Sequence, residues 1–237
     1  MRTPSRGHEL ATAGASVALV TIFVMVLAGC AVTEPQLHQL SPDVAATISI
    51  RPAPGVAPTK PEMELAIEVL RRRLGTLEVK NYSIAAGTEI TVSIGAQEDV
   101  FNTQQALQAN GLVAFVRGAG TGPEPEIGTA LTSPESLWPS AAVLSASVAT
   151  DTAGAQTLWM FLTPAGTEAL AAWSTAHVGE RLIVTLDGRV LSAPLITVPI
   201  TVGNFALPMA PGKAILPLKV IAAIIAGGPL PAGWRQP

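Results

Sequence analysis

The chain has 237 residues, of which only 13% are charged, and its formal net charge is −3. An average soluble protein has about 25% charged residues, and the mean hydropathy here is positive, +0.43. Because 14 Lys and Arg stand against 17 Asp and Glu, the composition excludes the basic surface of a nucleic-acid-binding protein. The single cysteine excludes a disulfide scaffold and a cysteine-built zinc site.

The first thirty residues have the layout of a secretory signal. Arg2 and Arg6 precede an uncharged, largely apolar stretch at 11–28, which ends in Leu-Ala-Gly-Cys at residues 27–30. This ending resembles the lipobox of bacterial lipoproteins, in which the cysteine becomes the lipidated N-terminus. It implies a signal peptide at 1–29, a palmitate-type anchor on Cys30 and a location on the extracytoplasmic face of the cell membrane. The alternatives are a buried thiol at Cys30 and an uncleaved anchor helix.

Residues 43–118 predict a first small α+β domain, which follows a polar tether at residues 30–42. An alternating strand at 46–50 precedes a helix that begins at Thr59, where Glu62 completes a capping box. Two alternating strands, a second helix and a last strand follow at 79–84, 89–94, 99–110 and 112–117. The order strand–helix–strand–strand–helix–strand is typical of the ferredoxin-like fold.

Three consecutive arginines, Arg71 to Arg73, stand near the end of the first expected helix. One hypothesis is a docking patch for an anionic partner. The alternative is a solvated helix end, where the helix dipole favours positive charge.

A Gly- and Pro-rich segment at 119–140 lacks apolar periodicity and predicts a linker or surface loop. Residues 141–231 predict a second small α+β unit, and residues 232–237 a C-terminal tail. The expected strands and helices of the second unit lie at 141–150, 158–162, 163–177, 181–186, 190–196, 198–207 and 217–227. The last of these helices is too short to cross a bilayer, so we expect it in the core.

Asp187 and Gly188 separate two strands with aliphatic residues. Asp-Gly in this setting is a strong signal of a two-residue β-hairpin, so we expect a structural turn. The alternative for Asp187 is a carboxylate at a binding site, and for His177 we expect a packing role at a helix end. No phosphate-binding loop, paired-histidine metal motif or nucleophile elbow is present. We therefore expect no catalytic residue, no metal and no cofactor.

Trp159 and Trp173 are the candidates for a polypeptide-binding surface, because tryptophan is enriched at protein interfaces. The alternative for both side chains is packing inside the second unit.

Several motifs resemble SecD, an accessory subunit of the Sec protein-export machinery. The run Leu-Ile-Val-Thr-Leu-Asp-Gly-Arg-Val-Leu-Ser-Ala-Pro-Leu-Ile at 182–196 is similar to the head of that family's first periplasmic domain. Phe-Leu-Thr-Pro-Ala-Gly at 161–166 and Gly-Gly-Pro-Leu-Pro at 227–231 extend the resemblance. Upstream, residues 66–74 and 111–117 resemble the base of the same domain. The resemblance covers about residues 43–231.

The resemblance implies a ferredoxin-like base at 43–118 and a head at 141–231, without the family's bundle of membrane helices. It further implies a non-enzymatic lipoprotein that binds exported polypeptide or Sec translocon subunits and assists export. The membrane is reached through Cys30, and nucleic acid is no partner. Two alternatives remain open: a repurposed structural or assembly lipoprotein of the envelope with no export role, and an envelope enzyme or small-molecule receptor.

Overall fold

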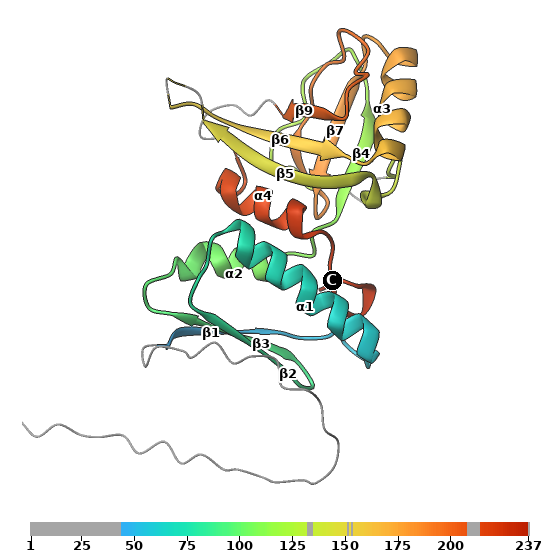
Figure 1. Ribbon diagram of the computed structural model, residues 1–237. Coiled ribbons are helices and arrows are strands. Elements are labelled where there is room, and N and C mark those ends of the chain that lie inside the picture. The colour runs from blue at the N-terminus through green and yellow to red at the C-terminus, as the bar shows by residue number, and fades with distance from the viewer. Residues whose placement is uncertain (1–43, 132–134, 151, 153, 208–213, 237) are drawn as a thin grey trace, which may run out of the picture. The chain divides into compact units, whose positions relative to one another are not determined.

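A computed structural model describes residues 44–131, 135–150, 152, 154–207 and 214–236 (Figure 1). The expected signal peptide at 1–29, the lipidation site Cys30 and the tether at 30–42 lie outside the described residues. The α+β class is confirmed, since the described chain combines helices with antiparallel sheets. The described strands form three sheets of three strands each, with the orders β1-β3-β2 (sheet A), β4-β7-β8 (sheet B) and β5-β6-β9 (sheet C).

Sheet A and two helices form the first part of the described chain, in the predicted order. Thr59 caps α1: its hydroxyl accepts from the Glu62 amide, and the Glu62 carboxylate accepts from the Thr59 amide at 2.9 Å. The apolar faces of α1, α2 and sheet A share one core cluster. The bounds are β1 (Val44–Ile50), α1 (Lys60–Thr76), β2 (Tyr82–Ala86), β3 (Ile90–Gly95) and α2 (Val100–Gln108).

The strand after α2 does not join sheet A. β4 (Val113–Gly118) pairs antiparallel with β7 (Arg181–Leu186), from Val113↔Leu186 to Gly118↔Arg181. The reason lies in its side chains, because Val113 and Phe115 are buried in the cluster of the second part of the chain. The expectation that residues 112–117 complete the first sheet is therefore wrong, and this pairing crosses the expected boundary at residue 118.

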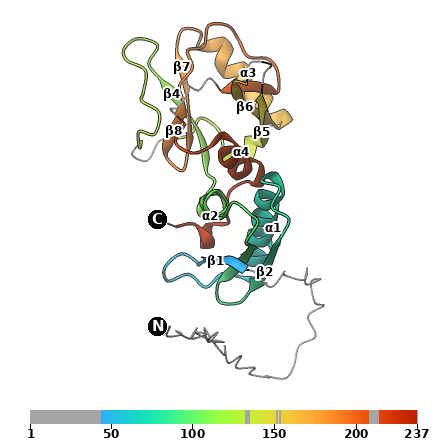
Figure 2. The same ribbon diagram turned by 90° about the vertical axis from the view of Figure 1, so that its left-hand side faces the viewer.

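The remaining elements build sheets B and C, α3 and α4. Seven of the ten residues of α4 are buried, and α4 contacts α1 and α2 as well as β5 and β6 (Figures 1 and 2). A helix covered on several sides is apolar all round, which explains the run of Val, Ile and Ala. The bounds are β5 (Val143–Thr150), β6 (Gln156–Leu162), α3 (Pro164–Ala176), β8 (Arg189–Ser192), β9 (Asn204–Leu207) and α4 (Leu218–Gly227).

Two segments expected at the surface contribute to the core. Trp138, inside the expected loop, is 8% exposed, and Trp234, inside the expected tail, is fully buried. Trp234 packs in the cluster of sheet A and α1, and the Gly233 carbonyl accepts from the Ala53 amide at 2.8 Å. Within the described residues, no helix is both long and apolar enough to cross a membrane.

Candidate polypeptide-binding surfaces

The outer face of sheet C is an uncharged surface with two aromatic side chains. Along β6, Leu158, Met160 and Leu162 are buried, so Trp159 and Phe161 lie on the opposite side of the strand and are half-buried. We call this side the sheet C face, which comprises Ser145, Ser147 and Ala149 of β5, Thr157, Trp159 and Phe161 of β6, and Asn204 and Ala206 of β9.

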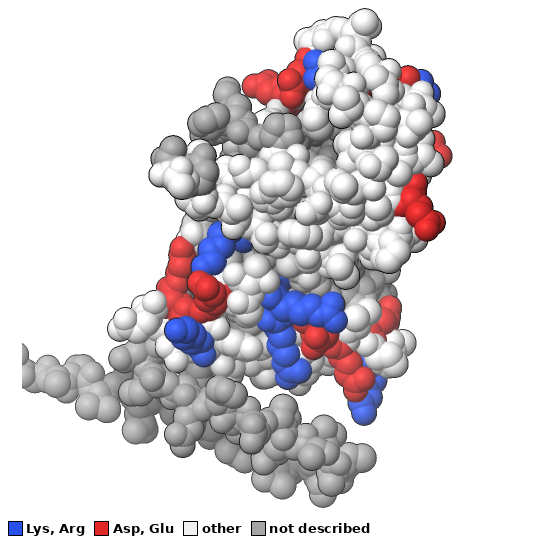
Figure 3. Space-filling model, turned by 45° about the horizontal axis from the view of Figure 1, so that its top comes forward, with Lys and Arg blue, Asp and Glu red and all other residues white. Residues whose placement is uncertain are grey.

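Small neighbours flank the aromatic rings of the sheet C face. The strand register places Ser147 and Ala206 on either side of Trp159. The strands β5, β6 and β9 contain no Lys, Arg, Asp or Glu. In the view of Figure 3 the charged side chains gather toward the lower part and the rim, and a broad surface without charge lies between them. Half-exposed aromatic rings between small, neutral residues suit contact with apolar or neutral polypeptide.

Trp173 lies in a different environment from Trp159. It packs against the core cluster that also contains Trp138. Its ring meets Trp138 edge-on at 6.2 Å between centroids and stacks on His177 at 4.8 Å. The Nδ1 atom of His177 lies 2.7 Å from the Trp173 carbonyl oxygen. The structure therefore places Trp173, partly buried, against the core cluster with His177 stacked on it, and leaves Trp159 outside that cluster on the sheet C face.

Asp187 and Gly188 occupy the two-residue loop between β7 and β8. Both have positive φ, 49° and 75°, which is the backbone of a type I′ turn. The Asp187 carboxylate also accepts from the Leu112 amide at 2.8 Å, and the Asp187 amide donates to the Leu112 carbonyl at 2.9 Å. The turn thus fixes the chain where it leaves α2 and enters β4.

Arg73 is fully buried, whereas Arg71 and Arg72 are exposed. Its guanidinium donates to four carbonyl oxygens: Ala106 at 2.8 Å, Ala109 at 2.6 Å, Asn110 at 3.4 Å and Gly228 at 2.8 Å. These carbonyls lie at the C-terminal ends of α2 and α4, where helices leave acceptors unsatisfied. Burial lowers the pKa of Arg73 to about 10, and the charge of Asp187 opposes this shift. Arg73 therefore joins α1, α2 and α4 and does not belong to a docking patch.

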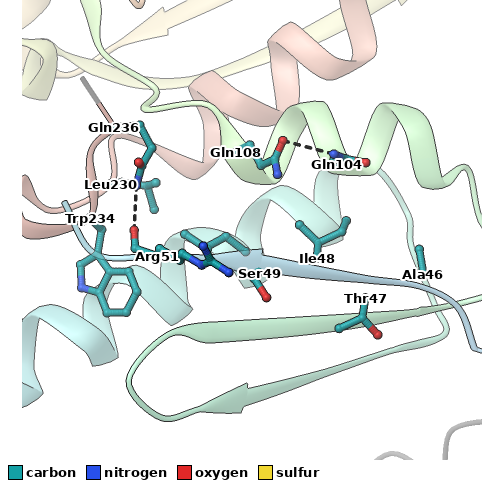
Figure 4. Close-up of a pocket in the computed structure, with 11 residues that line it drawn as sticks. Ala46, Thr47, Ile48, Ser49, Arg51, Gln104, Gln108, Leu230, Trp234 and Gln236 are labelled. Atoms are coloured by element: carbon teal, nitrogen blue, oxygen red, sulfur yellow. Dashed lines mark hydrogen bonds between the residues drawn. The ribbon is translucent and has the colours of Figure 1, made fainter. Parts of the chain in front are cut away.

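A groove runs along the free edge of β1 (Figure 4). It has a volume of about 530 Å³. Residues 46–51 form one side, and Gln104 and Gln108 of α2, with Leu230, Trp234 and Gln236, form the other. Within the described part of the chain, no three His, Cys, Asp or Glu side chains gather as a metal site would require.

The sequence did not predict the burial of three residues that matter here: Arg73, Trp138 and Trp234. A signal existed for Arg73, since Ala66, Leu70 and Arg73 are spaced i, i+4 and i+7 and share the buried face of α1. Trp138 lies among Gly and Pro residues without periodicity, so the sequence offers no comparable signal for its burial.

Comparison with known proteins gives one consistent picture. The protein translocase subunit SecD of Dictyoglomus turgidum is 26% identical over 223 residues, which is 85% of this chain and 52% of that protein. The chain is SecD-like in sequence and in fold. This chain spans about half the length of that curated relative. No family model matches the chain.

Two solved structures share this fold. SecDF, described as a membrane component that enhances protein export, matches 80% of this chain and 97% of the solved chain, with 22% identity and a TM-score of 0.60. SecDF in its super-membrane-facing form matches 79% of this chain and 29% of that chain, with 22% identity and a TM-score of 0.61. The described residues therefore have the architecture of a SecD-like periplasmic domain.

Proposed function

We propose that this chain is a non-enzymatic, lipid-anchored module on the extracytoplasmic face of the membrane, which assists protein export by holding exported polypeptide. The observation that carries the proposal is the similarity to SecD over 85% of the chain. The partners are exported polypeptide and, through it, the Sec translocon. The sheet C face around Trp159 is the proposed contact surface.

The composition of the sheet C face supports weak and general binding. A chain in transit presents many different sequences, so a surface for it gains little from charges that suit one sequence and repel another. Trp159 and Phe161 offer apolar contact area, while Ser147 and Ala206 beside them leave room for side chains of different size. Leu144, which a bulge sets out of register in β5, is a further exposed apolar residue of this sheet, with 64% of its surface exposed.

Site-specific photo-crosslinking tests the contact surface. A photoreactive phenylalanine derivative, which keeps an aromatic ring at the position, replaces Trp159 or Ser147, and a secretory chain is arrested during export in cells. We expect crosslinks to the arrested chain from both positions. Leu65 of α1, which is 52% exposed, provides the matched control. Equal crosslinking from Leu65, or none from the sheet C face, contradicts the proposal, and normal secretion in a deletion strain favours an envelope role without export.

The lipid anchor is tested separately because Cys30 lies outside the described residues. Metabolic labelling with a palmitate analogue should modify the wild-type chain and leave Cys30→Ser unlabelled. A labelled Cys30→Ser variant, or an unlabelled wild type in the membrane fraction, contradicts the anchor. Neither result changes the assignment of the sheet C face.

A further inference from the structure

Sheet A is open on the side of β1. Its order is β1-β3-β2, so β1 is hydrogen-bonded to β3 on one side and to no strand of the described chain on the other. In a ferredoxin-like sheet the fourth strand lies beside the first, and here the strand that follows α2 pairs with β7. The place of a fourth strand beside β1 is the groove of about 530 Å³ in Figure 4.

The walls of this groove are neutral and rich in amide groups. Gln104 and Gln108 of α2 face the edge of β1, and Gln104 Nε2 lies 3.4 Å from Gln108 Oε1 (Figure 4). Among the described residues that line the groove, Arg51 alone carries a charge. Its Nε atom forms an ion pair with Glu89 Oε2 at 3.0 Å. The lining therefore offers no unpaired charge to a charged ligand, whereas the side-chain amides and the backbone of β1 offer hydrogen-bond donors and acceptors to a peptide backbone.

At the Arg51 end of the β1 edge, a backbone carbonyl already accepts a hydrogen bond from a side-chain amide of the same chain. The side-chain Nε2 of Gln236 donates to the Arg51 carbonyl at 2.8 Å. The backbone of Gln236 is held by Asn110, whose Oδ1 accepts from the Gln236 amide at 2.8 Å and whose Nδ2 donates to its carbonyl at 2.9 Å. This contact has the chemistry of a strand-to-strand hydrogen bond, and it closes the groove at the Arg51 end. No described strand pairs with the edge from Ala46 to Ile50 on this side.

The open stretch lacks the usual protection of edge strands. Natural edges are blunted by charged side chains, proline or bulges. β1 has a bulge between Val44 and Ala46, and Pro52 follows its end, but residues 46–50 are Ala-Thr-Ile-Ser-Ile. At about 3.3 Å per residue these five positions offer roughly 17 Å of pairing edge.

We propose that the β1 groove is a strand-accepting slot that binds an extended, uncharged segment of a partner polypeptide by strand addition. The added segment completes sheet A, its backbone pairs with residues 46–50, and its inward side chains lie against Leu230 and the aliphatic parts of Gln104 and Gln108. The slot is distinct from the sheet C face and does not depend on the role in export.

The test uses the full chain with a synthetic peptide of about eight residues, in which Val and Thr alternate and both ends are blocked. Residue-resolved amide hydrogen exchange is measured with and without the peptide. We expect increased protection of alternate amides within residues 46–50, because every second amide of β1 points to the open side. The same peptide with N-methyl groups on alternate residues should give no protection.

Two variants on α2 make the test specific. Gln108→Trp fills the groove from an exposed position, and it should weaken peptide binding about tenfold or more, equivalent to about 1.4 kcal/mol. Phe101→Gln is the control, since Phe101 is 69% exposed on α2 and does not line the groove. Three outcomes would each overturn the proposal of strand addition. They are unchanged exchange at residues 46–50, equal binding of the N-methylated peptide, and undiminished peptide binding to Gln108→Trp. Trp159→Lys should leave this signal intact, so failure here and failure of the sheet C face are distinguishable.

Discussion

At the junction of α1, α2 and α4, which Arg73 holds together, buried polar groups are hydrogen-bonded to one another, and this distinguishes the junction from the uncharged sheet C face. At the junction, one buried guanidinium satisfies four carbonyl oxygens at the ends of two helices. The sheet C face has no charged residue in its strands and leaves Trp159 and Phe161 half-exposed. The first arrangement holds elements in one geometry, because an unpaired buried polar group is costly. The second tolerates substitution and leaves apolar area for a partner.

Glycines reinforce this difference at the junction. A Cβ atom on Gly227 would overlap Arg73 Cγ and approach the Val69 carbonyl oxygen to 3.0 Å. A Cβ on Gly111, where φ is +78°, would overlap Arg73 Nη2. The Arg73 side chain is therefore enclosed by backbone, and the Gly-Gly sequence at 227–228 has a packing reason as well as a helix-ending role.

The largest predicted effect is the loss of the Arg73 guanidinium. Arg73→Met keeps an apolar stem of similar length but leaves the carbonyls of Ala106, Ala109 and Gly228 without this donor. We expect a loss of about 3 kcal/mol or more in the free energy of unfolding, measured by urea denaturation. Arg72→Met is the control on the same helix. It removes an exposed i,i+4 ion pair with Glu68 at 3.0 Å and should cost less than about 0.5 kcal/mol. Equal losses in the free energy of unfolding of the two variants would contradict the role of Arg73 in holding the three helices together.

A methyl group at Gly227 is expected to have the next largest effect. Gly227→Ala forces Arg73 or α4 to shift, which should cost about 2 kcal/mol in the free energy of unfolding. Gly75→Ala in α1 is the matched control, because a Cβ there meets no atom within 4 Å. In a helix, this change should stabilise the protein by up to about 1 kcal/mol. Opposite signs in thermal or urea unfolding support the enclosure of Arg73, and a neutral Gly227→Ala refutes it.

Substitutions of the two candidate tryptophans should have different effects, one mainly on stability and the other mainly on polypeptide binding. Trp173→Ala removes the contacts with Trp138 and His177 and should cost about 2 kcal/mol in stability. Trp159→Ala should cost less, because Trp159 lies outside the core cluster, yet it should abolish crosslinking of exported chains at neighbouring Ser147. If Trp173→Ala alone reduces crosslinking at equal folded fraction, the contact surface has been assigned to the wrong tryptophan.

Local signals in the sequence predicted the elements well. The capping box at Thr59, the Asp-Gly turn and the period of α1 each depend on neighbours in sequence, and each is present in the structure. The strand after α2 was assigned to the wrong sheet because its partner, β7, is 63 residues further along the chain at its nearest ends. Strand pairing over such a distance is decided by burial of Val113 and Phe115, which a local pattern does not reveal.

The candidate surfaces were predicted less completely. The sequence singled out Trp159 and Trp173 as one pair, and their environments differ because β6 has two faces while α3 packs against the core. The β1 groove had no sequence signal, since it follows from the departure of β4 from sheet A. A free edge is a property of topology, and topology was the part of the fold that the sequence predicted least well.

The smallest predicted effect concerns an ion pair at the surface of sheet B. Arg117 Nε and Nη2 each donate to the Glu180 carboxylate at 2.6 Å. This hydrogen bonding, with the charge of Arg117, lowers the pKa of Glu180 below its ordinary value of 4.5. Because the folded-state pKa is the lower one, the pair stabilises the protein above pH 4.5 and is lost as the pH falls through the lowered pKa.

Glu180→Gln should therefore lower the melting temperature slightly at pH 7, and the difference from wild type should vanish in acid. Glu64→Gln serves as the control, since Glu64 lies 3.9 Å from Lys60 in an exposed pair on α1. High salt should reduce the small effect at Glu180 as well, because screening acts on exposed charges. A difference that grows on acidification would mean that Glu180 stabilises the fold as a neutral group. In that case the tie between β4 and the start of β7 would rest on backbone pairing and on the neutral carboxyl group of Glu180, and not on surface charge.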